Sequence, residues 1–303
     1  MTPWVLVSLG HGRRQKESTE YQRWQENAAI MAAQRGGLEA RISVAEGDVG
    51  VQTKQILEAV SAPAGQRPVA VVVCTVSVVG FDRVARSALA AGVGWVVVDN
   101  VRPLSSLLSE FPDQLVSWAS VDYVETGRLS ARMAKALLPS GGRVLCLEGP
   151  SVAAAALQRR RGIEEVFKES QIEIGDTLVG DWKPAGAARE TTAWLERTGS
   201  SAVKPDLVVS HNDEMAEALL RVFREKRPAW GKVPAIGCDG LPDVGQRLVN
   251  DGDLLATIIN PAASGPGVDL VVRWLRGEKV DPVVVPVRPY PAIEELAPLS
   301  RGA

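Results

Sequence analysis

Short apolar runs alternate with amphipathic segments along the whole chain. Most of the runs are continuous stretches of Val, Leu and Ile rather than in-out alternations, which is typical of strands covered on both faces. The predicted strands span residues 4–9, 38–44, 68–74, 94–98, 116–119, 143–147, 175–180, 206–210, 233–237 and 254–258. The predicted helices span residues 20–35, 51–60, 80–91, 122–137, 152–169, 186–198, 213–226, 241–251 and 264–276. Because strand and helix alternate throughout, we expect an α/β fold with doubly wound parallel sheets.

The number of strands and the length of the chain indicate two lobes. About ten strands are many for one compact sheet, and 303 residues are enough for two domains. A division near residues 119–122 gives two halves of similar size. No low-complexity linker separates them, so we expect the chain to cross between the lobes more than once through short strands. The proline-rich segment 281–296 is interpreted as a final crossing plus an edge strand, because sheets tolerate proline at edges and ends.

Composition narrows the classes of function. The chain carries a formal net charge of −2 and has no basic tail or stripe, which argues against nucleic acid as a partner. No apolar run is long enough to span a membrane, so membrane insertion is not expected. The first predicted strand begins almost at Met1, with no leader before it. We therefore expect a cytoplasmic protein, or an exported one whose signal was removed before this numbering begins.

Motifs for metals, cofactors and catalysis are missing. The three cysteines have no metal-ligand spacing, and two histidines are too few for a histidine-rich metal site. Gly10-His11-Gly12 follows the first strand, but the third glycine of a dinucleotide fingerprint is missing. Phosphate-loop, zinc-protease and nucleophile-elbow motifs are also absent. We therefore predict no metal, no cofactor and no catalytic residue, and we interpret His11 as a solvated loop residue, with a ligand-binding or catalytic role as the alternative.

Short polar side chains follow five of the predicted strands. They are Asp99 with Asn100, Asp122, Asn212, Asp239 and Asn260. Open α/β sheets bind ligands at the carboxyl ends of their strands, and carboxylates and carboxamides suit the hydroxyl groups of a polyol. The alternative for Asn212 and Asp213 is helix capping alone, with Asp213 as the N-cap.

Two further side chains offer complementary chemistry. Arg159 lies in a predicted helix and offers a planar fork of donors. Trp182 follows another strand, and its indole offers a flat apolar face for the C–H face of a sugar ring. For Trp182, packing in the core is the alternative.

Six segments carry a resemblance to a known family. They are LCLEGPSVAAAALQRRRGIEEVF at 145–167, GDWKPAGA at 180–187, LVVSHNDEMAEAL at 207–219, AIGCDGLPDV at 235–244, GDLLATIINP at 252–261 and LRGEKV at 275–280. The chain resembles the type I periplasmic binding proteins, close to the ribose-binding protein and its relatives in bacterial sugar uptake. The same superfamily includes the ligand domains of lac-repressor-type regulators.

The resemblance implies two α/β lobes joined by a multi-strand hinge, with a ligand clamped between them. The implied N-terminal lobe consists of residues 1–120 and 261–288, and the C-terminal lobe of residues 121–260 and 289–303. The residues implied to hold the ligand are Asp99, Asn100, Arg159, Trp182, Asn212, Asp239 and Asn260. Asn100 stands where relatives often carry Arg, and Asn260 where they carry Gln, so ribose itself is not the expected ligand.

The loop after the first strand departs most from the family. Relatives place aromatic side chains there, whereas residues 10–22 of this chain are polar. Counting back from the following helix makes Tyr21 and Gln22 the best candidates for ligand contact. The alternative is that Tyr21 begins the apolar face of that helix with Trp24, Ala28 and Met31.

The function implied by the resemblance is that of a non-catalytic solute-binding protein for ABC-type sugar uptake. Its ligand would be a monosaccharide, a related polyol or a sugar acid, and its partner a membrane permease complex. The alternative is an intracellular sensing domain that passes hinge closure to a regulator or sensor kinase. An anionic ligand is the alternative, because the loop carries the basic residues Arg13, Arg14 and Lys16. A neutral sugar is favoured, because Asp99 and Asp239 would repel an anion.

Overall fold

The computed structural model describes residues 2–10, 20–77, 80–99 and 104–299, and its contacts divide the chain into two compact units. Unit 1 consists of Met1–Val121 and Ala262–Val285, and unit 2 of Asp122–Pro261 and Pro286–Ala303. The chain therefore passes between the units three times, after Val121, Pro261 and Val285. The lobe boundaries expected from the sequence differ from these junctions by one residue at the first two and by three at the last.

Unit 1 contains a six-stranded parallel sheet in the order β11-β5-β4-β3-β1-β2. Its strands are β1 Trp4–Leu9, β2 Glu39–Val44, β3 Ala70–Cys74, β4 Gly94–Val98, β5 Val116–Val121 and β11 Val283–Val285. Its helices are α1 Glu20–Arg35, α2 Val49–Val60, α3 Phe81–Ala90, α4 Ser105–Glu110 and α10 Ser264–Leu275, with a short 3-10 turn η1 at Ala64–Gln66.

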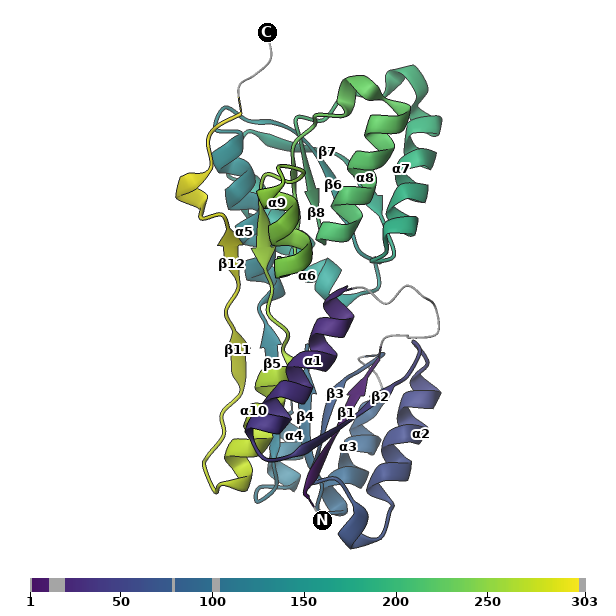
Figure 1. The fold of residues 1–303 in the computed structure, drawn as a ribbon, viewed down its shortest axis with the longest axis vertical. Coiled ribbons are helices and arrows are strands. Elements are labelled where there is room, and N and C mark those ends of the chain that lie inside the picture. Colours follow the sequence, from purple (N-terminus) through teal and green to yellow (C-terminus); the bar gives the residue numbers. More distant parts are fainter. Residues whose placement is uncertain (1, 11–19, 78–79, 100–103, 300–303) are drawn as a thin grey trace. The chain divides into compact units, whose positions relative to one another are not determined.

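Helices cover both faces of the unit 1 sheet (Figure 1). Side chains of a strand alternate between its two faces, so Trp4 and Leu6 pack in one cluster with α2 and α3. On the opposite face, Gly267 of α10 lies against Val98 and Val72, and the contacts of α10 extend to α1. This double cover explains why the strands are continuous apolar runs.

Unit 2 contains a four-stranded parallel sheet in the order β7-β6-β8-β9 and a separate antiparallel pair, β10 with β12. Its strands are β6 Gly142–Glu148, β7 Ile172–Val179, β8 Leu207–Ser210, β9 Ala235–Ile236, β10 Thr257–Ile259 and β12 Arg288–Tyr290. Its helices are α5 Tyr123–Leu137, α6 Ala154–Phe167, α7 Pro184–Thr198, α8 Asp213–Lys226 and α9 Arg247–Asn250. Shorter turns are the 3-10 turns η2 Gly199–Ser201, η3 Pro228–Trp230 and η5 Ile293–Glu295, and the π-helical turn η4 Pro242–Gln246.

The unit 2 sheet is also covered on both faces (Figure 1). Leu145 and Leu147 of β6 pack in the cluster that contains residues of α7 and α8. Val144 and Cys146, which alternate with them, pack in the cluster that contains residues of α5 and α6. The predicted α/β fold with parallel sheets is therefore confirmed in both units.

Several elements differ from those predicted. Helix α4 was not predicted, because its six residues make less than two turns and show no hydrophobic repeat. The last predicted strand, 254–258, is found as β10 at Thr257–Ile259. The proline-rich segment forms β11 at the edge of the unit 1 sheet and then β12, which pairs antiparallel to β10. Within the described ranges, no helix has both the length and the apolar character needed to cross a membrane.

Helices α5 and α6 cross at close range through two glycines. A Cβ atom on Gly127 would lie 2.0 Å from the backbone oxygen of Arg159, and one on Gly162 would lie 2.0 Å from that of Val124. Only glycine allows the two backbones to approach this closely. The crossing therefore sets the position of Arg159 on α6.

We expect Gly127→Ala to lower the free energy of unfolding by about 1–3 kcal/mol, because the added methyl group forces α5 and α6 apart. The matched control is Gly65→Ala, since no heavy atom lies within 4 Å of a Cβ built on Gly65. That variant should stay within about 0.5 kcal/mol of the parent protein. Urea unfolding followed by circular dichroism measures both changes, and equal stability of the two variants would contradict the close crossing.

Candidate functional site

Three of the expected ligand residues form one connected cluster in unit 2. Arg159 Nη2 donates a hydrogen bond to Asp239 Oδ1 at 3.3 Å, and Asn260 Nδ2 donates to the same oxygen at 3.4 Å. Arg159 Nη1 donates to the backbone oxygen of His211. All three side chains are buried or nearly so. Asp239 follows β9 and Asn260 follows β10, so the residues after these two strands meet at the guanidinium group of Arg159 on α6.

This cluster balances its own charges. Burial raises the pKa of Asp239 above its ordinary value, and the charge of Arg159 and the hydrogen bonds from Asn260 and Arg159 oppose that rise. A buried carboxylate is tolerated when it is paired and hydrogen-bonded, as Asp239 is by the guanidinium. Asn260 Oδ1 is buried and has no hydrogen-bond partner among the residues that the structure describes. The cluster therefore offers an acceptor beside a neutralised ion pair.

Trp182 lies next to this cluster and is half-buried. Its ring stacks on that of His211 with 6.4 Å between the centroids, and Arg159 Cζ lies 5.6 Å from its centroid. A Cβ atom on Gly149 would lie 2.2 Å from the Trp182 ring, so the indole rests against bare backbone. Trp182 also packs against the core cluster of α7 and α8. Core packing is thus part of its role, and stacking on a ligand stays a prediction.

Asn212 is the N-cap of α8, and the expectation that Asp213 caps this helix is wrong. Asn212 Oδ1 accepts a hydrogen bond from the Met215 backbone N–H at 2.8 Å. Asn212 Nδ2 donates to the backbone oxygen of Trp182 at 2.9 Å, so only one N–H of its amide is left for a ligand. Contact between Asn212 and a ligand therefore stays a prediction.

Asp213 has a different role from the one expected. It is the first residue of α8, is buried, and accepts hydrogen bonds from the Gly240 backbone N–H at 2.8 Å and the Thr257 hydroxyl at 2.6 Å. Cβ atoms on Gly237 and Gly245 would lie 2.0 and 2.1 Å from its carboxylate oxygens. Asp213 therefore fixes the turn that carries Asp239. Sequence reasoning missed this role, although the glycines at 237, 240 and 245 were a visible signal of close backbone approach.

In unit 1, a buried glutamine brings two expected ligand residues together. Gln25 Nε2 donates hydrogen bonds to Asp99 Oδ2 at 2.8 Å and to the Tyr21 hydroxyl at 3.2 Å. Gln25 Oε1 accepts from the Ser264 backbone N–H at 3.0 Å, and the Ser264 hydroxyl donates to the Gln25 backbone oxygen. Gln22 lies in the same first turn of α1 and is half-buried. Gln25 was missed, although it stands one helical turn after Tyr21.

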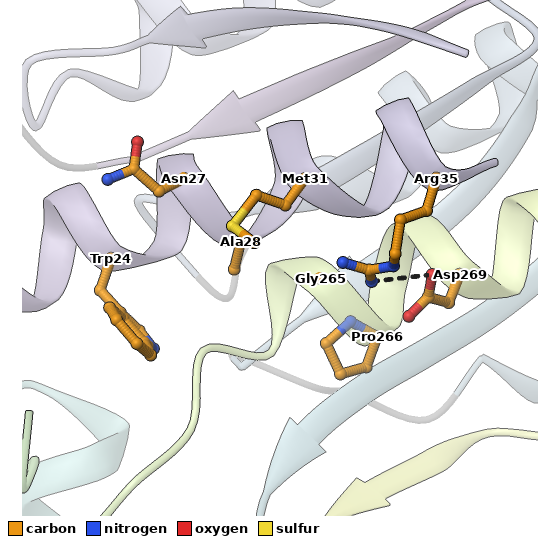
Figure 2. Close-up of a pocket in the computed structure, with 8 residues that line it drawn as sticks. All are labelled: Trp24, Asn27, Ala28, Met31, Arg35, Gly265, Pro266 and Asp269. Atoms are coloured by element: carbon orange, nitrogen blue, oxygen red, sulfur yellow. Dashed lines mark ion pairs between the residues drawn. The ribbon is translucent and has the colours of Figure 1, made fainter. Parts of the chain in front are cut away.

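The face of α1 that carries Trp24, Ala28 and Met31 is partly exposed. Trp24, Ala28 and Met31 line a pocket of about 260 Å³ together with Gly265 and Pro266 of α10 (Figure 2). Trp24 is 41% exposed and Met31 is 58% exposed, and the pocket lining does not include Tyr21. These three residues thus share one apolar face of α1, and that face is partly exposed. Whether Tyr21 begins this face or contacts the ligand stays a prediction. Figure 2 also shows the ion pair between Arg35 and Asp269 at one side of this pocket.

Some expected residues lie outside the described ranges. Among them are Asn100 of the ligand set and the loop residues His11, Arg13, Arg14 and Lys16. Their predicted roles stay predictions.

A family model described as a periplasmic binding protein domain matches residues 15–278. The chain belongs to this family. The predicted resemblance is thereby confirmed, and the chain is similar to curated solute-binding proteins.

Three such relatives are informative. The putative rhizopine-binding protein of Rhizobium meliloti is 26% identical over 81% of this chain and 77% of its own length. The xylitol-binding protein of Mycolicibacterium smegmatis is 29% identical over 58% of this chain and 50% of its own length. The ribose import binding protein of Escherichia coli is 28% identical over 55% of both. The matches thus span about half the length of two of these relatives.

Solved structures share the fold of this chain. A galactofuranose binding protein superposes with a TM-score of 0.78 at 18% identity, covering 95% of this chain and 94% of the other. A solute binding protein from Bacillus halodurans with bound myo-inositol gives 0.78 at 20% identity, with the same coverage. At these identities the similarity establishes the fold.

We expect Gln25→Met to lower the free energy of unfolding by about 1–3 kcal/mol, because Tyr21, Asp99 and the buried Ser264 lose a hydrogen-bond partner while the side-chain volume is kept. The control is Gln34→Met on the same helix, where Gln34 is exposed. It should change stability by less than about 0.5 kcal/mol. If denaturant titrations give both variants the parent stability, Gln25 does not organise the ends of these elements.

A second expectation concerns pH. Burial, reinforced by the nearby Asp239, holds the pKa of Asp213 well above its ordinary value. The folded protein therefore binds this proton more tightly than the unfolded chain does. The stability that Asp213 contributes is present below about pH 4 and is lost as pH rises through its folded pKa.

Asp213→Asn removes this titration. The free energy of unfolding of the parent minus that of the variant should therefore fall as pH is raised from about 4 to about 8. Urea titrations of both proteins across this range measure the difference. A constant or rising difference is the contrary result.

Proposed function

We propose that this chain is a non-catalytic solute-binding protein for a small, neutral, polyhydroxylated ligand such as a monosaccharide or polyol. The observation that carries the proposal is the buried acceptor Asn260 Oδ1 beside the ion pair of Arg159 and Asp239. A hydroxyl group can donate to that oxygen, and the same hydroxyl can accept a hydrogen bond from a neighbouring donor.

Charge supports a neutral ligand rather than an acid. Asp239 neutralises Arg159, which is the cation of the unit 2 cluster, so this cluster has no net positive charge to attract a carboxylate or phosphate. In unit 1, Asp99 adds a carboxylate at the end of β4, held by the uncharged amide of Gln25. We infer that each unit contributes one group of ligand contacts, with Tyr21, Gln22, Asp99 and Asn100 in the first and Arg159, Trp182, Asn212, Asp239 and Asn260 in the second.

The relatives support the same class of ligand and a role in uptake. Their names record binding of xylitol, of rhizopine and of ribose for import. We therefore propose that this chain delivers its ligand to a membrane permease complex of the ABC type. A sensing role has less support. The fructose binding periplasmic domain of a hybrid two component system shares the fold of this chain at 19% identity, and at that identity the similarity concerns the fold alone.

The test is a thermal-shift screen with D-ribose, xylitol, myo-inositol and gluconate. A ligand at about 100 times its dissociation constant stabilises the folded protein by about 2.7 kcal/mol. We expect a neutral compound to stabilise the protein and gluconate to have no effect. Stabilisation by gluconate alone would overturn the neutral class, and no stabilisation by any neutral sugar or polyol would overturn the proposed function.

Asp239→Ala should weaken binding of the best neutral compound at least tenfold, because it removes a buried charged hydrogen-bond partner of the proposed ligand, at a cost of about 2–5 kcal/mol. Asp243→Ala is the matched control, since Asp243 is exposed in the adjacent turn η4. Isothermal titration calorimetry compares the two variants with the parent. Unchanged affinity in Asp239→Ala would remove Asp239 from the site.

A further inference from the structure

His211 is a buried histidine with a defined set of neighbours. It lies between β8 and α8 and is 2% exposed. The Gly149 backbone N–H donates a hydrogen bond to its Nδ1 at 3.2 Å, and its ring stacks on Trp182. Its own backbone oxygen accepts a hydrogen bond from Arg159. His211 therefore contacts two of the residues expected to bind the ligand.

The contact with Gly149 fixes the form of the imidazole. Because Nδ1 accepts a hydrogen bond, it carries no hydrogen, and the neutral ring must carry its hydrogen on Nε2. The protonated ring would present a donor at both nitrogens and would lose this contact. Burial, together with the positive charges of Arg159 and Arg160, lowers the pKa of His211 well below its ordinary value. Nε2–H is thus a hydrogen-bond donor at neutral pH.

This donor is unsatisfied. His211 Nε2 is buried and has no hydrogen-bond partner within the described part of the chain. Most buried polar groups in native proteins have a partner, and a buried donor without one is unfavourable. The unsatisfied acceptor Asn260 Oδ1 belongs to the same cluster, to which it is connected through Asp239 and Arg159. The cluster therefore carries an unsatisfied donor and an unsatisfied acceptor, the pair that a hydroxylated ligand completes.

We propose that His211 contacts the ligand directly, donating a hydrogen bond from Nε2–H to a ligand oxygen, and so contributes to specificity. The proposal rests on the function proposed above. A donor at this position favours hydroxyl, ether and carbonyl oxygens, each of which has a lone pair, and disfavours an ammonium group, which has none. His211 thus selects for oxygen on the part of the ligand that lies beside Trp182.

Two substitutions separate the donor from the rest of the side chain. In His211→Asn, the amide oxygen takes the place of Nδ1 as acceptor for the Gly149 N–H, and the side chain ends short of the Nε2 position. In His211→Gln, the longer side chain places an amide N–H donor near the Nε2 position. The probe is whichever of D-ribose, xylitol and myo-inositol binds the parent protein most tightly.

We expect His211→Asn to weaken binding of that probe by about five- to a hundredfold in calorimetry, and His211→Gln to stay within about fivefold of the parent. Thermal unfolding without ligand should show both variants folded. Parent affinity in His211→Asn would overturn the proposal, and so would an equal loss in both variants, which would indicate packing against Trp182 instead. Failure of the parent to bind any of the three compounds would remove the proposed function and this inference with it.

Discussion

The rest of the unit 2 site depends on the hydrogen bonds that the buried carboxyl group of Asp213 accepts. This group binds the backbone of Gly240 and the hydroxyl of Thr257, and so joins the start of α8 to the turn after β9 and to β10. Asp239 directly precedes Gly240, and Asn260 directly follows β10, which contains Thr257. The backbone N–H of Asn260 donates a hydrogen bond to the backbone oxygen of Asp239 at 3.1 Å. Glycine is required around Asp213, because a Cβ atom at 237 or 245 would occupy the space of its carboxylate. The geometry of the candidate ligand groups is therefore set by a residue that is itself fully enclosed.

Unit 1 organises its strand ends with amides instead of a carboxylate. Gln25 connects α1 to Asp99 and Ser264, and Gln52 connects α2 to β1 and β3. Gln52 Nε2 donates to Ser8 Oγ and to the Cys74 backbone oxygen, while its Oε1 accepts from the Val76 backbone N–H. An amide both donates and accepts, so one buried side chain can join unlike partners without the desolvation cost of a charge. A carboxyl group suits the position of Asp213, where both partners are donors, because each of its oxygens can accept a hydrogen bond.

The sequence was sufficient for the α/β fold. It was also sufficient for grouping Arg159, Asp239 and Asn260, which the structure brings into one cluster, because strand ends and family motifs mark these positions directly. Their contact with a ligand stays a prediction. The sequence was not sufficient for Gln25, whose partner Ser264 lies 239 positions away and is brought close only by the folded unit. The sequence also did not identify the N-cap of α8. Asn and Asp are equally good N-caps, and Asn212 and Asp213 stand next to each other. The side chain of Asp213 points towards Gly240 and Thr257, so it cannot cap α8. Tertiary contacts therefore determine that Asn212 is the N-cap.

Backbone conformation connects these observations. Four non-glycine residues in the described part of the chain have a positive φ, and three of them are candidate ligand residues: Asp99 at 64°, Trp182 at 70° and Asp239 at 94°. Such conformations persist when surrounding contacts hold them, and they concentrate at functional sites. Asp adopts them readily, whereas they are unusual for a bulky side chain such as Trp. Asn212 donates to the backbone oxygen of Trp182 while capping α8, so its side chain connects the strained residue to a rigid helix. The position of Trp182 is thereby fixed by contacts within unit 2, so the stacking predicted for its indole would need no free energy from binding to order this residue.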